Sequence, residues 1–309
     1  MADHAFDVGI LAEHSRKPDW GPGKVVRVRP PYVWVFFRDA PGREARQFPG
    51  SLLERSSNQT DMVLDNLPPF IERDGVHLLP SERYTLQEAL DIFHARGPEG
   101  FAGQGTNKPQ KDRERRRLAR AEYVRTMGAG QAEELLAQED VAELGHRLLA
   151  TVAAARTLSN ADTVALRAGL QDEDAARAYF AALLAFLTGE PVEASFAAYV
   201  SAAARIAEAG GAAAASWPLV TLVPFLAQPE RHLLLQPSVT CAAALRLGFD
   251  LPYRPTPNWL TYDALCRLGR IYVAALANAG ARDLDDVHFF LATLVLKTPA
   301  TAPASPAVA

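Results

Sequence analysis

Short runs in which apolar and polar residues alternate fill residues 7–56, and this period of two is typical of β-strands. The runs are rich in β-branched and aromatic residues and recur every ~8–12 residues, a spacing that predicts a small sandwich or barrel. We place strands at 9–13, 24–29, 32–37, 44–48 and 52–55, separated by Pro/Gly turns. A module of this size buries little surface, so we expect it to lean on the chain that follows.

The residues on the two faces of the predicted strands 24–29 and 32–37 suggest what these strands contact. Strict alternation in the run 24–29 puts Val26 and Val28 on one face, opposite Arg27. The run 32–37 is apolar on both faces: one carries Val33, Val35 and Phe37, and the other carries Tyr32, Trp34 and Phe36. Two interpretations stay open. Either Trp34 and Phe36 pack against the helical domain, or aromatics beside arginines form a surface for nucleobases or a protein partner.

From about residue 85 the apolar positions recur with a helical period. Thr85 and Glu88 predict a capping box, and Asp172 predicts the cap of a later helix. A third of the residues between 129 and 215 are Ala, the best helix former. Further helices are expected at 192–209 and from Ser238, Thr261 and Asp283, whereas 217–226 and 253–259 are expected to connect helices.

The predicted fold is therefore of the α+β class. A small β-barrel occupies 1–60, a linker 61–84, a larger all-α domain 85–297 and a disordered tail 298–309.

Three segments of the N-terminal module follow one another in a recognisable order: GILAEH at 9–14, PDWGPGKV at 18–25 and VWVFF at 33–37. This order resembles a short bacterial family of unknown function, which is similar to the Tudor-like barrel of CarD-type transcription factors and to the C-terminal tail of UvrD-type helicases. The Trp20–Gly23 turn is its most specific part, while Ala12 and Pro22 depart from the pattern. Residues 217–296 loosely resemble uncharacterised bacterial helical proteins, which implies no activity.

The resemblance implies a Tudor/SH3-like barrel that docks onto RNA polymerase or nucleic acid and has no active site of its own. On this reading the partner-binding candidates are Trp20, Lys24, Arg27, Arg29, Tyr32 and Trp34.

The charge of the whole chain is −4, which excludes a uniformly basic nucleic-acid coat. The segment 108–125 is locally basic, with eight basic and three acidic residues. It predicts a site for nucleic-acid phosphates formed by Lys108, Lys111, Arg113, Arg115, Arg116, Arg117 and Arg120. The alternative is a solvated helix face with pairs such as Glu114 with Arg117.

Other classes of site find little support. Cys241 and Cys266 are the only cysteines, which argues against a disulfide framework or a structural zinc site. The Gly-rich segment 97–107 lacks the phosphate-loop pattern, and no Gly-x-Ser-x-Gly elbow occurs. Asp285 and His288 would share a helix face, but two ligands do not make a metal site. No cofactor is therefore expected.

The leading hypothesis is a non-enzymatic, cytoplasmic, bacterial protein that associates with DNA or RNA polymerase, or with a DNA-bound complex. The sequence shows neither a signal-peptide pattern nor an apolar run long enough to span a membrane, so no membrane partner is expected. The rival hypothesis is an enzyme or small-ligand-binding protein whose site lies in the helical domain near Trp217, His232, Arg254 and Trp259, with the barrel as a targeting module. The partner's identity and the oligomeric state stay open.

Overall fold

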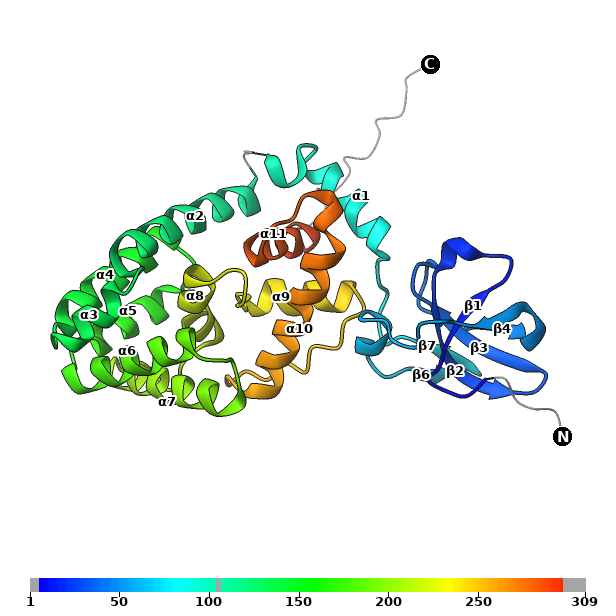
Figure 1. The fold of residues 1–309 in the computed structure, drawn as a ribbon, viewed down its shortest axis with the longest axis horizontal. Helices are drawn as coiled ribbons and strands as arrows, with labels where there is room; N and C mark the ends of the chain where they lie inside the picture. Colours follow the sequence, from blue (N-terminus) through cyan, green and yellow to red (C-terminus); the bar gives the residue numbers. More distant parts are fainter. Residues whose placement is uncertain (1–5, 104–106, 297–309) are drawn as a thin grey trace, which may run out of the picture.

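The computed structural model describes residues 6–103 and 107–296 and has a mixed α+β fold, with an antiparallel sheet followed by helices (Figure 1). The sheet order is β4-β3-β2-β1-β5. The strands are β1 (Leu11–His14), β2 (Gly23–Arg29), β3 (Tyr32–Phe37), β4 (Arg46–Pro49) and β5 (Leu53–Arg55). All five predicted strands are confirmed. In the described residues β4 and β5 are the two edges and do not pair, so the sheet is not a closed barrel.

A β-bulge in β2 corrects the predicted faces of that strand. The register between β2 and β3 shifts between Val25 and Arg27, so strict alternation fails at this point. Val28 packs with the cluster on one face of the sheet, and Val26 packs with the cluster on the other. The prediction that Val26 and Val28 share a face was wrong because the extra residue reverses the alternation beyond it.

The segment 61–84, predicted as a linker, contains a second small sheet that was not predicted. Strands β6 (Ile71–Arg73) and β7 (Val76–Leu78) form a hairpin around Asp74 and Gly75, both of which have positive φ. Buried Leu64 and Leu79 from this segment pack against the sheet. They complete the cluster that contains Leu11, Phe36, Ala45 and the half-buried Trp34. The sheet is thus covered on this face by the chain directly after it.

The helices begin largely where their capping residues predict. Thr85 forms a capping box with Glu88, and Asp172 and Asp283 cap their helices. The helices are α1 (Leu86–Arg96), α2 (Lys108–Met127), α3 (Gln131–Ala137), α4 (Val141–Ala155), α5 (Asn160–Gly169), α6 (Glu173–Thr188), α7 (Glu193–Ala209), α8 (Trp217–Ala227), α9 (Pro237–Arg246), α10 (Trp259–Ala275) and α11 (Leu284–Leu294). In the described part of the chain none is long and apolar enough to cross a membrane.

Helix α8 was predicted as a connecting segment. Ser216 caps it, Pro218 lies in its first turn, and Pro224 is accommodated inside it. A proline in the first turn is compatible with a helix, because the backbone N–H that it lacks is unpaired there in any case. The helix is apolar all round and almost completely buried, so it has no polar face that would reveal a helical period.

Helices α2 to α7 form one end of the molecule, and α8 to α11 lie between them and the sheet (Figure 1). The last helix, α11, packs against α1, α2, α9 and α10, so the C-terminal part of the chain returns to the start of the helical region. The predicted disordered tail, 298–309, lies outside the described residues.

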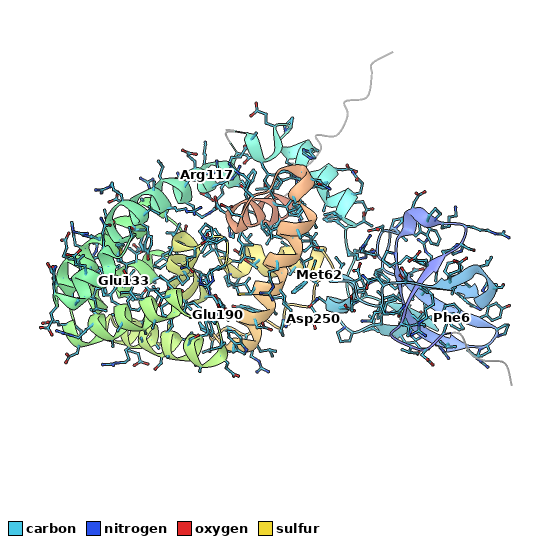
Figure 2. All side chains as sticks on the ribbon, in the orientation of Figure 1. Phe6, Met62, Arg117, Glu133, Glu190 and Asp250 are labelled. Carbon is cyan, nitrogen blue, oxygen red and sulfur yellow. The ribbon has the colours of Figure 1, made fainter. Side chains whose placement is uncertain are left out.

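Arg83 anchors the sheet to the helices. Its Nη2 donates to the backbone carbonyls of Phe37, Arg38 and Ala40 at 2.6–3.1 Å. Met62 and Asp250 are also at this junction (Figure 2), where the Asp250 N–H donates to the carbonyl of Asn66. The two parts of the fold are therefore tied together by polar contacts, and those of Arg83 are largely buried.

Candidate functional site

The six partner-binding candidates of the sheet do not form a single surface. Trp20 ends a 3-10 turn and packs edge-on against His14 and at a tilt against Phe37. The Arg46 guanidinium lies 4.6 Å from the centre of its ring. Lys24 is held in place by its Nζ, which donates to the carbonyl of Leu64 at 3.1 Å. Trp20 and Lys24 are thus committed to contacts within the chain.

The other four candidates do lie together. Arg27 is opposite Trp34, and Arg29 is opposite Tyr32, in the β2–β3 ladder. We call these four residues the hairpin ladder. The Arg27 guanidinium lies 5.4 Å from the Trp34 ring centre and also pairs with Glu72 at 3.5 Å. Tyr32 is 42% exposed, and Arg29 is exposed with no polar side-chain partner in the described residues.

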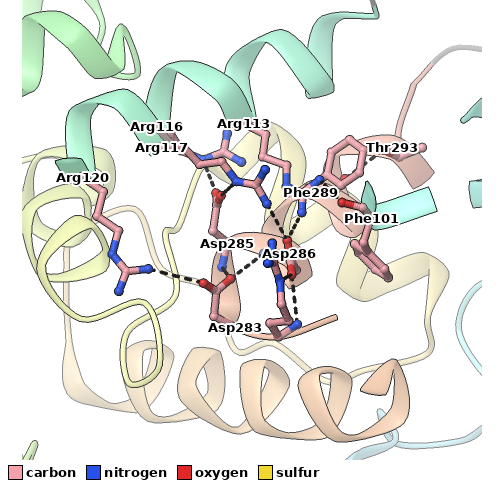
Figure 3. Close-up of polar contacts among 11 residues, drawn as sticks. Phe101, Arg113, Arg116, Arg117, Arg120, Asp283, Asp285, Asp286, Phe289 and Thr293 are labelled. Carbon is pink, nitrogen blue, oxygen red and sulfur yellow. Dashed lines mark hydrogen bonds and ion pairs between the residues drawn. The ribbon is translucent and has the colours of Figure 1, made fainter. Parts of the chain in front are cut away.

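Helix α2 carries the seven phosphate-binding candidates, and they divide into three groups. Arg113 and Arg116 are buried and pair with Asp286 and Asp285 of α11 (Figure 3). Arg113 also donates to the carbonyl of Phe101 at 2.8 Å. These two arginines therefore do not belong to a solvent-facing phosphate site.

Lys108, Lys111 and Arg115 form the second group, on the exposed side of α2. Lys108 and Arg115 both pair with Asp112, at 2.7 Å and 3.1 Å, whereas Lys111 has no charged partner in the described residues. Exposed pairs of this kind contribute at most about 1 kcal/mol each, so these side chains can exchange partners at little cost.

Arg117 and Arg120 form the third group. Arg117 turns toward α11 and not toward Glu114, with its Nε 3.9 Å from Asp285 and its Nη2 3.6 Å from Asp286. Arg120 lies 3.5 Å from Asp283 (Figure 3). Both side chains stay about two-fifths exposed.

Arg117 and Arg120 line a cavity of about 260 Å³, which we call the arginine pocket. Its other charged residues are Arg116, Arg282, Asp283 and Asp285, and its apolar wall consists of Phe225, Leu226 and Pro229.

The aspartates at the start of α11 repel one another. Burial raises the pKa of Asp283, and the neighbouring Asp286 and Asp285 raise it further, against the hydrogen bonds of the helix cap. Burial also disfavours the charged form of Arg113 and so lowers its pKa, although Asp286 opposes that shift. Each buried ion therefore depends on its partner across the interface between α2 and α11.

Most of this arrangement was not predicted from the sequence. A helix was expected to start at Asp283 and Asp285 was considered as a metal ligand, and neither was related to the basic run. The available signal was the acidic stretch 283–286, with three aspartates in four residues, which complements the excess of positive charge on 108–125. His288, predicted to share a face with Asp285, is fully buried, and neither ring nitrogen has a hydrogen-bond partner in the described residues.

Three of the four residues of the rival hypothesis, Trp217, His232 and Trp259, take part in packing, whereas Arg254 is exposed and contributes its backbone carbonyl. The indole N–H of Trp217 donates to the carbonyl of Arg254 at 2.7 Å, and His232 Nδ1 lies 2.6 Å from the hydroxyl of Tyr262. Trp259 packs on Phe196 with ring centres 6.0 Å apart.

A cavity of ligand size is found elsewhere, where the sheet meets α1 and α10. It measures about 790 Å³ and is lined on the helical side by apolar residues such as Leu90 and Ile271. Its polar lining includes Asp19, Asp61 and Arg38, whose guanidinium is paired with Asp39 and Asp61.

Comparison with known proteins identifies no relative: no family model matches the chain, and no curated protein or solved structure matches it. The resemblance of residues 7–56 to the Tudor-like family therefore stays a prediction.

Proposed function

We propose that this chain is a non-enzymatic bacterial protein that docks onto DNA- or RNA-polymerase-bound complexes through its N-terminal sheet, which acts as a Tudor-like module. The observation that carries this proposal is the hairpin ladder, in which two arginines and two aromatic rings are paired across neighbouring strands.

The chemistry of the hairpin ladder suits docking. An aromatic ring beside a guanidinium stacks on nucleobases and is also a frequent centre of protein interfaces. Trp34 is half buried against the cluster around Phe36, which holds its ring in place, while Tyr32 and Arg29 are left for a partner. A rigid aromatic surface loses little conformational entropy when a partner binds.

Two features support the Tudor-like assignment. Five antiparallel strands follow one another, and after a 3-10 turn at Gly50–Leu52 the last strand returns to pair with the first. The Trp-Gly turn, the most specific part of the resemblance, requires glycine: Gly21 has φ +63°, and a Cβ there would lie 2.3 Å from Asp39 Oδ2. The turn is thus fitted closely against the end of β3.

The exposed side of α2 adds a second contact in this proposal. Lys108, Lys111 and Arg115 bind phosphates of a duplex without reading its sequence, in a way that weakens as salt rises.

Capture from native bacterial lysate, with and without nuclease, tests the proposal. We expect RNA polymerase or DNA to be retained, and the double variant Arg29→Glu/Tyr32→Ala to lose it. Arg205 and Tyr253 are an exposed arginine and an exposed tyrosine outside the sheet, so Arg205→Glu/Tyr253→Ala is the matched control. Equal retention by both double variants would contradict docking through the hairpin ladder.

A small-ligand-binding protein is the second candidate, and the cavity of about 790 Å³ between sheet and helices favours it. Cavities of ~300–1,000 Å³ at domain junctions are typical of small-molecule sites. A ligand held there would raise the melting temperature by contacting both parts of the fold, and screening metabolites by thermal shift tests this alternative.

A further inference from the structure

The arginine pocket and the buried pair beside it, Arg113 with Asp286, together carry more positive charge than their aspartates neutralise. Five arginines surround the start of α11: Arg113, Arg116, Arg117, Arg120 and Arg282. Three aspartates, Asp283, Asp285 and Asp286, face them. The difference is two positive charges. Glu230 is the next carboxylate, but it is 61% exposed and lies 3.9 Å from Arg120.

The aspartates are already occupied by other donors. Asp285 accepts from Arg116 Nε at 2.7 Å, and Asp286 accepts from the buried Arg113. Asp283 accepts from two backbone N–H groups of its own helix at 3.1 Å. At least one oxygen of each carboxylate is thus engaged at short range, and the second oxygens of Asp283 and Asp285 meet the rim arginines only at 3.5 Å and 3.9 Å.

The three rim arginines are held only by long contacts. Arg117, Arg120 and Arg282 approach these aspartates at 3.5–3.9 Å, beyond the 2.7–3.2 Å of a good N–H···O hydrogen bond. A guanidinium has five N–H donors, so each of these side chains retains donors for another acceptor. Arg117 and Arg120 line the same cavity as Arg282.

We propose that the arginine pocket binds a phosphate dianion, either free inorganic phosphate or the terminal phosphate of a small monoester. A phosphate monoester carries about −1.5 to −2 charge near neutral pH, which matches the surplus of two. Arginine recognises phosphate by paired N–H···O bonds, and donors from α2 and from the segment just before α11 converge here.

The shape of the pocket favours a terminal phosphate over a nucleic-acid backbone. The cavity of about 260 Å³ is closed on one side by Phe225, Leu226 and Pro229, against which a small organic group can pack. Arg117 lies on α2, far from the sheet where Phe6 marks the opposite end of the molecule (Figure 2). The inference therefore does not rest on docking through the hairpin ladder.

Isothermal titration of the full chain at constant ionic strength, set with chloride, tests the site with three probes: inorganic phosphate, phenyl phosphate and dimethyl phosphate. We expect the two dianions to bind and the diester monoanion to bind more weakly. Tighter binding of phenyl phosphate would assign the site to an organic monoester, whereas tighter binding of inorganic phosphate would assign it to the free ion. Equal binding of dimethyl phosphate, or no binding of either dianion, would overturn the proposal.

Single variants locate the binding site. Arg117→Gln and Arg282→Gln should each weaken phosphate binding roughly ten-fold or more, because each removes a charge-assisted hydrogen bond. Arg282 is 71% exposed, so its replacement tests the pocket without disturbing the fold. Arg177→Gln is the matched control, since Arg177 is as exposed as Arg117 but pairs with Glu139 and Glu173 away from the cavity. An equal loss in the control would show a general charge effect and would contradict the site.

Discussion

Arg116 and Asp285 lie 169 residues apart in the sequence, yet the Arg116 Nε donates to Asp285 Oδ1 at 2.7 Å with both side chains largely buried. The contact joins the second helix of the chain to the last described one. It also explains why part of the basic run serves the fold: a buried guanidinium needs a carboxylate partner to offset the loss of its hydration.

Asp285→Ala should destabilise the protein by about 3–5 kcal/mol, because it leaves the charge of Arg116 buried without a partner. The double variant Arg116→Met/Asp285→Leu should lose much less, since it removes both charges together. Urea unfolding measures the free energy of unfolding of the single and the double variant. As a control, Arg125→Met breaks the exposed pair with Glu122 and should cost less than about 1 kcal/mol. A double variant no more stable than Asp285→Ala would count against a buried pair.

The stability of the protein should fall as the pH drops below 6.5. Burial lowers the pKa of His232 from 6.5 to about 4, with Arg231 adding to the shift. Burial also holds the pKa of His288 well below 6.5, and Arg116 and Lys108 lower it further. Below pH 6.5 the unfolded chain binds protons that the folded chain excludes. The contribution of these histidines is therefore complete above this pH, and each of them removes about 1.4 kcal/mol per pH unit below it, for His232 down to about pH 4.

The free energy of unfolding of His288→Leu, measured with urea at several pH values between 7 and 5, checks this expectation. The variant should show a shallower decline of stability than the parent protein, because one of the two histidines with a lowered pKa no longer contributes. His146 is exposed, and His146→Leu should leave the decline as it is. An unchanged slope in His288→Leu would mean that His288 does not resist protonation in the folded protein.

The two aromatics of the hairpin ladder should differ in their effect on stability. Trp34 packs against the cluster around Phe36, so Trp34→Ala should destabilise the protein by up to about 3 kcal/mol. Tyr32 is 42% exposed, and Tyr32→Ala should change stability by no more than about 0.5 kcal/mol. Thermal melting of both variants tells them apart. Equal losses would mean that Tyr32 is also covered, which would weaken its role in docking.

The exposed lysines and arginine of α2 should determine the salt dependence of DNA binding. Replacing Lys108, Lys111 and Arg115 by Gln should flatten the slope of log K against log salt by up to about 0.9 for each phosphate that these side chains neutralise. Folding should be little affected, because these side chains are exposed. Fluorescence anisotropy with a duplex at several salt concentrations measures the slope. An unchanged slope would exclude this side of α2 as a binding surface for phosphates.

The local parts of the fold could be predicted from the sequence. Strand spacing and the capping residues Thr85, Asp172 and Asp283 act over a few residues, so short patterns carry the information. The hairpin around Asp74-Gly75 also has a local signal, since an Asp-Gly pair between short strands is a strong indication of a hairpin.

The candidate sites depend on contacts that no local pattern contains. Arg113 and Arg115 look alike in the sequence, and only the return of α11 against α2 buries the first and leaves the second exposed. The faces of β2 similarly depend on a bulge whose position is determined by pairing with β3.

Equilibrium binding of purified bacterial RNA polymerase and of duplex DNA to the Arg29→Glu/Tyr32→Ala variant tests the central claim most directly. Docking through the hairpin ladder predicts that affinity for at least one of the two falls about ten-fold or more, with an unchanged melting temperature. It also predicts that Arg205→Glu/Tyr253→Ala binds like the parent protein. Unchanged affinity of Arg29→Glu/Tyr32→Ala for both polymerase and DNA would contradict the account.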